Sequence, residues 1–153
     1  MDKLKRLMYL NERMKVEALS NSPLFDEYVS LHNEIVQERF ISKAPQHFQE
    51  ETRFELPIGW FDHFDKALTE LCAFAKEHNI DFTFIQLKEK FGSLRIYLRY
   101  DIRFLASEEI AKKFSEIRNK YEITAGKVCI SCGEPGVMQT NGWYHPACKN
   151  HLA

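Results

Sequence analysis

Residues 129–151 read CISCGEPGVMQTNGWYHPACKNH, and this stretch decides how the end of the chain folds. It contains two Cys/His pairs, each with a two-residue gap that lets both side chains turn toward one ion. In a reducing compartment, clustered Cys and His favour a metal site over disulfides. Soft thiolate ligands favour zinc over magnesium or calcium. The predicted ligands of one zinc ion are Cys129, Cys132, Cys148 and His151.

The residues between the two pairs predict a small zinc finger over 127–153. Asn141-Gly142 separates two short β-prone runs, which is the strongest short hairpin signal that a sequence offers. A Cys-x-x-Cys turn, a hairpin and a last ligand pair on one helical turn are typical of a treble-clef-like or zinc-ribbon finger. His145 is a competing ligand, but it falls in the hairpin, whereas His151 completes the two-residue spacing. Three thiolates and one imidazole close a tetrahedral shell, so the zinc is predicted to be structural.

The preceding stretch, 54–126, is predicted to form an α+β core. Apolar residues at three- to four-residue spacing indicate a helix from about 60 to 77, with Asn79 as its stop. Ser107 is a typical N-cap for a further helix, which Ala125-Gly126 would end.

Between these two helices the sequence predicts a β-hairpin. Its first strand, 82–87, is apolar on both faces, whereas 94–100 alternates and therefore has one exposed face. Gly92 lies in the turn, where a positive φ costs little. The candidate binding residues are those of this hairpin and one aromatic of the finger: Lys88, Lys90, Arg95, Tyr97, Arg99 and Trp143.

These cations and the aromatic between them suit a phosphate backbone, a stacked base or an acidic protein surface. Period two places Arg95, Tyr97 and Arg99 in a row on the exposed face of one strand. The alternative is an ordinary solvated strand face, balanced by Glu89 and Asp101.

The N-terminal part is predicted to be a helical hairpin. Asp2 is a plausible N-cap for a helix over 3–19, and Ser22-Pro23 begins a second helix, to about residue 40. Their apolar stripe could also pair with a second copy, which predicts a possible homodimer. Residues 41–53 show no periodicity and are expected to be a connecting loop. The predicted domains are 1–41, 54–126 and 127–153.

Composition narrows the class of protein. The chain has 153 residues, 44% of them hydrophobic, and a formal net charge of −1, which excludes coating of nucleic acid by bulk attraction. No segment has the roughly 20 apolar residues of a membrane span, and the N-terminus is too charged for a signal peptide. We therefore expect a cytoplasmic protein without a membrane partner. Cys72, in an apolar helical pattern, is expected to be a small buried side chain.

Three segments resemble a family of small uncharacterised zinc-finger proteins from phages and bacterial genomes. Residues 86–97, QLKEKFGSLRIY, are similar to its K-E-K-F-G-G-L-R segment, with Ser93 in place of the second glycine. Residues 129–151 resemble its C-x-x-C-G-x-P-G … G-W … C-x-x-H ending. Residues 54–61 resemble its aromatic G-W entry to a helix, with Pro57 and Ile58 as departures. The resemblance implies a zinc site and a phage or mobile-element origin, but no activity.

Three functions remain open on the sequence. The leading hypothesis is a non-enzymatic, zinc-stabilised protein, phage-encoded and acting in the host cytoplasm, that binds and perhaps inhibits a host protein or defence component. The alternative is a nucleic-acid-binding zinc-finger module. A nuclease or other enzyme with a structural zinc is less favoured, because no convergent set of catalytic groups is found and no catalytic residue is proposed.

Overall fold

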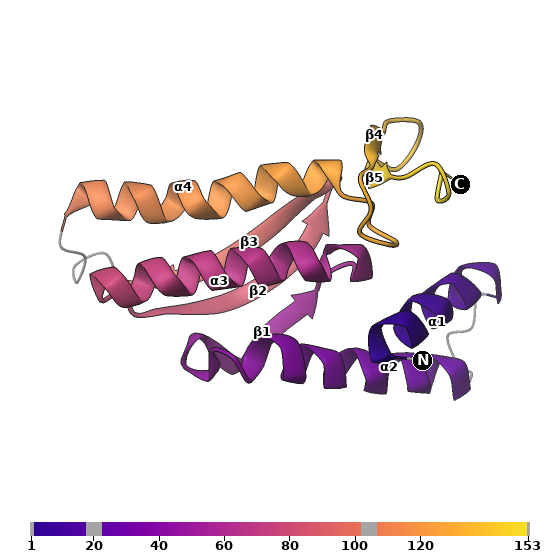
Figure 1. Cartoon of the computed structure of the whole chain (residues 1–153), viewed down its shortest axis with the longest axis horizontal. Helices are drawn as coiled ribbons and strands as arrows, with labels where there is room; N and C mark the ends of the chain where they lie inside the picture. Colours follow the sequence, from indigo (N-terminus) through magenta and orange to yellow (C-terminus); the bar gives the residue numbers. More distant parts are fainter. Residues whose placement is uncertain (1, 18–22, 102–106, 153) are drawn as a thin grey trace. The chain divides into compact units, whose positions relative to one another are not determined.

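The computed structural model describes residues 2–17, 23–101 and 107–152. The chain divides into two compact units, residues 1–43 and 44–153, which are described separately. The predicted α+β class is confirmed, with helices, a small sheet and a C-terminal Cys/His segment (Figure 1). Among the described residues, no helix has the length and apolar character that crossing a membrane requires.

The first unit is the predicted helical hairpin. Helix α1 (Lys3–Glu17) begins at Asp2, whose side chain accepts a hydrogen bond from the Lys5 N–H at 2.9 Å, so the expected N-cap is confirmed. Helix α2 (Pro23–Val36) continues into a π-helical turn, η1 (Gln37–Ile41). Ser22, the expected N-cap of α2, lies outside the described residues. Ion pairs between the helices show that they run antiparallel: Lys3 with Glu34 and Glu38, and Arg6 with Glu27.

The second unit contains the sheet, two long helices and the Cys/His segment. Its elements in chain order are η2 (Pro45–His47), β1 (Phe48–Glu55), η3 (Ile58–Trp60), α3 (Phe61–His78), β2 (Phe82–Lys90), β3 (Ser93–Tyr100), α4 (Glu108–Thr124), η5 (Ala125–Lys127), β4 (Val137–Gln139) and β5 (His145–Ala147). As expected, α3 ends at Asn79, in the left-handed region (φ 56°), and the Ser107 hydroxyl caps α4 by accepting from the Ile110 N–H.

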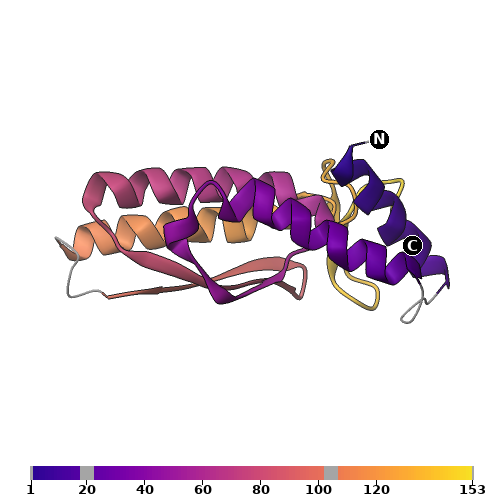
Figure 2. The same cartoon turned by 90° about the horizontal axis from the view of Figure 1, so that it is seen from below.

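Both long helices pack on the same face of a three-stranded sheet. The strand order is β1-β2-β3, with β1 parallel and β3 antiparallel to the central β2. Phe64 of α3 meets Phe84 edge-on, and Phe114 of α4 packs against Phe82, so both helices contact β2. Figure 2 shows α3 and α4 on one side of the strands.

Strand β1 corrects the expectation that residues 41–53 form a loop. Its pairing with β2 is interrupted between Phe48 and Arg53, where the register shifts. The Thr52 hydroxyl fills this bulge by donating to the Phe84 carbonyl at 2.6 Å and accepting from the Gln49 N–H at 3.0 Å. The bulge breaks the period-two pattern, which is why the sequence showed no strand there. The expected hairpin is therefore two strands of a larger sheet.

Strand β3 of the β2–β3 hairpin has the predicted alternation. Leu94 and Ile96 are buried, whereas Tyr97 and Arg99 are exposed. The turn between the strands is Phe91-Gly92, with φ of 53° and 81°, and Lys90 pairs with Ser93 across it. Two successive positive φ values are typical of the tight turns that match strand twist.

Candidate metal centre

The four predicted ligands lie together at the end of the second unit. Their ligand atoms are all within 4.8 Å of one another: Cys129 Sγ, Cys132 Sγ, Cys148 Sγ and a ring nitrogen of His151. The sulfurs of Cys132 and Cys148 are 3.7 Å apart. Zn–S bonds of about 2.3 Å in a tetrahedral shell place two sulfurs roughly 3.7–3.8 Å apart, so this spacing fits zinc. The cluster can therefore hold a metal ion.

His151 presents Nδ1 to the cluster. This nitrogen is 3.8 Å from Cys129 Sγ and 3.1 Å from Cys148 Sγ. The competing candidate, His145, is not part of the group, because its Nδ1 donates to the Trp143 carbonyl and its ring stacks on Trp143. His151, the histidine that completes the two-residue spacing, is thus the one that lies with the three cysteines.

A tight turn holds the first ligand pair. The Gly133 N–H donates to the Cys129 carbonyl at 2.9 Å, and the Cys129 N–H donates to the Glu134 carbonyl at 2.8 Å. Burial by itself raises the pKa of Cys129, but backbone N–H groups of Cys148, Ser131 and Cys132 bring this pKa below its ordinary value. The turn is therefore arranged to stabilise a thiolate.

The three thiols compete for negative charge in the absence of a cation. Burial, together with the neighbouring sulfurs of Cys129 and Cys148, raises the pKa of Cys132 to about 12. Three adjacent thiolates need a divalent cation among them to be stable together. By contrast, burial raises the pKa of the isolated Cys72 to about 11, so this half-buried thiol is not a nucleophile at neutral pH.

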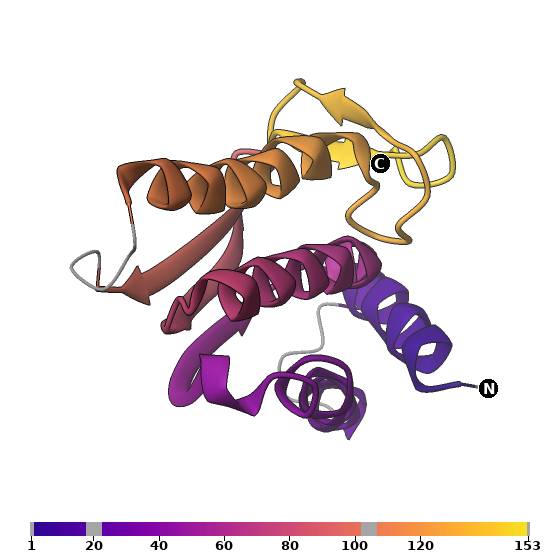
Figure 3. The same ribbon diagram turned by 60° about the vertical axis from the view of Figure 1, so that its left-hand side comes forward.

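The metal segment is anchored on η3, the short turn that leads into α3. The Gly59 N–H donates to the Ile130 carbonyl at 2.9 Å, and Trp60 Nε1 donates to the Val128 carbonyl at 2.9 Å. A Cβ at Gly59 would lie only 2.1 Å from the Cys129 carbonyl oxygen, so only glycine fits. Figure 3 shows the loop that follows α4 lying above the start of α3. In the sequence, Gly59 and Trp60 were noticed only as the G-W motif that precedes a helix, and their contact with the metal segment was not predicted.

The hairpin and the last ligand pair differ in detail from the prediction. Strands β4 and β5 pair antiparallel, but Asn141-Gly142 lies within a longer loop, 140–144, rather than forming the whole turn. The second ligand pair was expected on one helical turn at the start of a very short helix. It does lie on a single turn, in which the His151 N–H donates to the Cys148 carbonyl at 3.0 Å, but no helix follows β5 among the described residues.

The β4–β5 hairpin also contacts the turn between β2 and β3. A Cβ at Gly92 would meet the Met138 Sδ at 2.5 Å and the Tyr144 carbonyl oxygen at 3.2 Å. The Glu89 carboxylate fixes the same turn by accepting from the Gly92 N–H at 2.8 Å. The β2–β3 turn and the β4–β5 hairpin, which were predicted as separate parts, are thus in direct contact.

The predicted binding residues fall into two groups. Lys88 is directly opposite Arg95 across the strands, and its Nζ lies 5.8 Å from the centre of the Tyr97 ring. Arg99 follows on the same face of β3, and Lys90 precedes the turn. Trp143 belongs instead to the loop 140–144, where it is 57% exposed.

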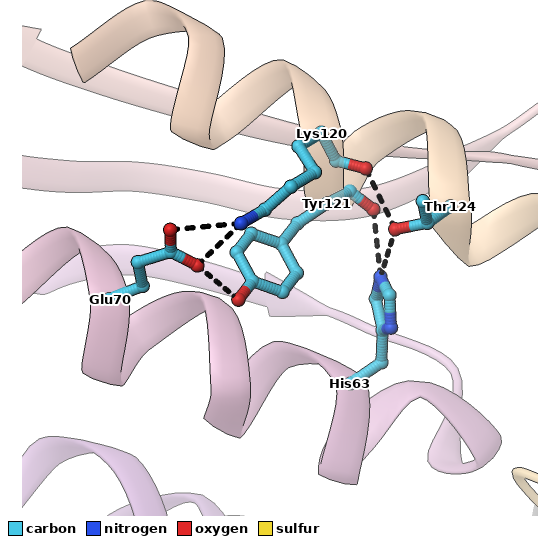
Figure 4. Close-up of polar contacts among 5 residues, drawn as sticks. All are labelled: His63, Glu70, Lys120, Tyr121 and Thr124. Carbon is cyan, nitrogen blue, oxygen red and sulfur yellow. Dashed lines mark hydrogen bonds and ion pairs between the residues drawn. The ribbon is translucent and has the colours of Figure 1, made fainter. Parts of the chain in front are cut away.

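A polar cluster missed by the sequence analysis joins α3 to α4 (Figure 4). Glu70 accepts hydrogen bonds from the Tyr121 hydroxyl and from Lys120 Nζ, the latter at 2.7 and 2.8 Å. His63 Nε2 donates to the Tyr121 carbonyl at 2.8 Å, beside the Thr124 hydroxyl. These contacts link two helices far apart in the sequence, so no local pattern could reveal them.

Comparison with models of protein families, with curated proteins and with solved structures finds no match for this chain. Its function is therefore argued from the site itself.

Proposed function

We propose that this is a non-enzymatic binding protein whose Cys/His segment is closed by one structural zinc ion. The observation that carries the proposal is the convergence of four ligand atoms within 4.8 Å at the end of the second unit. Zinc with three thiolates and one imidazole has a full tetrahedral shell, whereas a catalytic zinc keeps a position for water. The ion would supply folding energy rather than chemistry.

The anchoring of this segment supports a structural role. Hydrogen bonds from Gly59 and Trp60 tie the segment that contains the Cys-x-x-Cys turn to η3, at the entry to α3. A segment of this length cannot build a core by itself, so metal and anchor together would fix its shape. The hairpin that the ion supports would then hold exposed side chains, such as Trp143 and Tyr144, in a defined place.

The proposal also concerns the class of partner that the protein binds, a protein or a nucleic acid. The sequence favoured a host protein or defence component as target of a phage-encoded inhibitor, with nucleic acid as the alternative. The exposed aromatic side chains of the β4–β5 hairpin support a protein partner in general terms. The face of the sheet that contains Lys88, Arg95 and Arg99 supports nucleic acid more specifically, because these cations lie around the Tyr97 ring.

The zinc is tested by replacing one ligand and one unrelated thiol. Cys132→Ser removes a ligand, whereas Cys72→Ser changes a thiol outside the cluster and serves as the matched control. We expect one zinc per chain in the natural protein and in Cys72→Ser, and much less in Cys132→Ser. Hydrogen exchange should show residues 127–152 unprotected in Cys132→Ser while β2 and α3 stay protected.

Two results would contradict the proposal. One is a purified protein with far less than one bound metal that nevertheless melts cooperatively with residues 127–152 protected. The other is a Cys132→Ser variant that binds zinc and melts as Cys72→Ser does.

A further inference from the structure

One face of the sheet in the second unit is not covered by its helices. The rings of Phe82 and Phe84 point from β2 to α3 and α4, as their contacts with Phe64 and Phe114 show. On β3, Leu94, Ile96 and Leu98 share the face of Phe84, so Arg95, Tyr97 and Arg99 point to the opposite face. The register shift between Phe84 and Gln86 reverses the alternation of β2, so Lys88, which pairs with Arg95, points to that opposite face as well. Figure 2 shows the two helices together on one side of the strands.

The uncovered face is rich in positive charge. Lys88 and Arg95 are directly opposite each other on β2 and β3, and like charges in this position repel. The carboxylate of Glu55 on the adjacent β1 is already engaged, by Arg53 at 2.8 Å and by Gln86 at 2.9 Å. Glu89, the expected counter-charge, instead accepts from the Gly92 N–H. Asp101 is beside Arg99, at the far end of β3, where both line one hollow.

Arg95 is held without an acceptor for one of its donors. Its Nε is shielded from solvent and has no hydrogen-bond partner among the described residues. A buried donor without a partner is unfavourable, and natural structures keep few of them. The Nε of Arg95 is thus held in place by packing, and among the described residues it has no acceptor.

Tyr97 adds a flat aromatic surface between the cations. Its side chain is 41% exposed, and Arg95 and Arg99 flank it two residues away on each side of the same strand. Arg95 and Arg99 are therefore four residues apart, roughly 13 Å along a strand, which is of the order of two intervals between successive phosphates in an extended single strand. Cations at this interval can follow a backbone while a base stacks on the ring.

We infer that Lys88, Arg95, Tyr97 and Arg99 form a binding site for single-stranded nucleic acid. This inference rests on the proposed binding function and names its partner class. The cations contact phosphates on either side of Tyr97, and Tyr97 stacks on an unpaired base, whose face only a single strand exposes fully. An acidic peptide could use the cations but has no counterpart for the ring. A duplex is disfavoured, because the flat sheet face presents no element that enters a groove.

Affinity for labelled oligo(dT), measured by fluorescence anisotropy, tests the site. With three phosphates neutralised, the logarithm of the association constant should fall with the logarithm of salt concentration with a slope of about −2. Arg95→Glu should weaken binding at least about tenfold in low salt. Lys112→Glu, with the same charge change on the exposed side of α4, should weaken binding less than about twofold.

The stacking contact is tested separately. Tyr97→Leu should weaken binding about five- to tenfold while leaving the salt slope unchanged, because no phosphate contact is lost. Tyr97→Phe keeps the ring and should bind as the natural protein does. Zinc content and thermal melting, measured on every variant, show that each one is folded.

The possible outcomes separate this inference from the proposed function. Folded protein with one zinc that does not bind oligo(dT) at low salt overturns the inference and leaves the zinc proposal intact. Equal losses in Arg95→Glu and Lys112→Glu, or stronger binding of poly-glutamate than of oligo(dT), also overturn it. Metal-free protein that binds oligo(dT) through Arg95 and Tyr97 supports the inference and contradicts the zinc proposal.

Discussion

At Gly59, the backbone of the α3 entry meets the backbone of the Cys-x-x-Cys turn with no space for a side chain. A Cβ there would lie 2.1 Å from the Cys129 carbonyl oxygen and 2.5 Å from the Ile130 carbonyl carbon. Both are main-chain atoms beside a ligand, so they cannot move away without displacing the metal segment. The absence of a side chain at Gly59 thus determines whether the Cys-x-x-Cys turn can pack against the entry to α3.

Gly59→Ala should therefore lower the free energy of unfolding by about 1–3 kcal/mol, the usual effect of overpacking. It should also make zinc easier to remove with a chelator. Gly126→Ala is the matched control, because its Cβ would make only ordinary contacts, with the flexible Met138 side chain at 3.4 Å and with the Gly92 carbonyl oxygen at 4.0 Å. Urea denaturation of the zinc-saturated proteins measures the difference. Equal stability of the two variants would contradict the docking contact.

The members of the Cys/His cluster could be predicted from the sequence, because the spacing within each pair is local. The surroundings of the ligands could not. The Gly59 N–H bonds Ile130, a residue distant in the sequence, and only the fold brings the two together. The same holds for Gly92 and Met138. The only sign of such a contact in the sequence is a glycine outside a recognisable turn, such as Gly59. A glycine in that position can have several other causes, so it does not predict a contact.

At the scale of elements, β1 shows where pattern reading failed. Helices α3 and α4 and strand β3 have continuous periodicity and were predicted near their observed bounds, and β2 was predicted from a run of β-forming residues. The pattern of β1 is broken by a bulge, and side chains replace part of its main-chain pairing. Besides Thr52, the buried His47 donates from Nδ1 to the Phe82 carbonyl at 2.8 Å. A parallel edge strand held in this way has no local signature.

The junction of α3 and α4 predicts a dependence of stability on pH. Burial lowers the pKa of His63 below 6.5, its ordinary value, and Lys66 acts in the same direction. The unfolded chain therefore binds a proton at a higher pH than the folded chain does. The contribution of His63 to stability is fully present above the unfolded pKa and is lost as pH falls through the folded pKa.

Thermal melting at pH values between about 7.5 and 5.5 checks this contribution. The natural protein should lose more stability on acidification than His63→Gln, whose amide can still donate to the Tyr121 carbonyl. Excess zinc in both samples keeps the metal ligands equally occupied. Melting temperatures that fall in parallel would show that His63 does not titrate differently in the two states.

At the scale of the whole molecule, the net charge of −1 conceals local asymmetry. Positive charge gathers on the uncovered face of the sheet, whereas the helical hairpin of residues 2–17 and 23–41 is crossed by ion pairs such as Arg6 with Glu27. Composition excluded bulk attraction to nucleic acid, but it could not show that cations and an aromatic share one face. Pairing of the helical hairpin with a second copy stays a prediction, as does a phage origin.

The division into parts follows the packing rather than the motifs. The sequence suggested separate parts over 54–126 and 127–153, and both ranges fall in the compact unit of residues 44–153. Contacts of the metal segment with Gly59, Trp60 and Gly92 account for this union. We therefore propose that one metal ion stabilises residues 127–152, which pack against the sheet and helices of the same unit.

Titration of the metal-free protein with Co²⁺, followed by visible absorption, tests this claim most directly. Cobalt substitutes for zinc in tetrahedral thiolate sites and reports their geometry. The account predicts saturation at one equivalent with the intense bands of a tetrahedral sulfur-rich site, altered by His151→Ala and unchanged by His145→Ala. Weak bands typical of six oxygen or nitrogen ligands, or a spectrum that depends on His145 rather than His151, would contradict it.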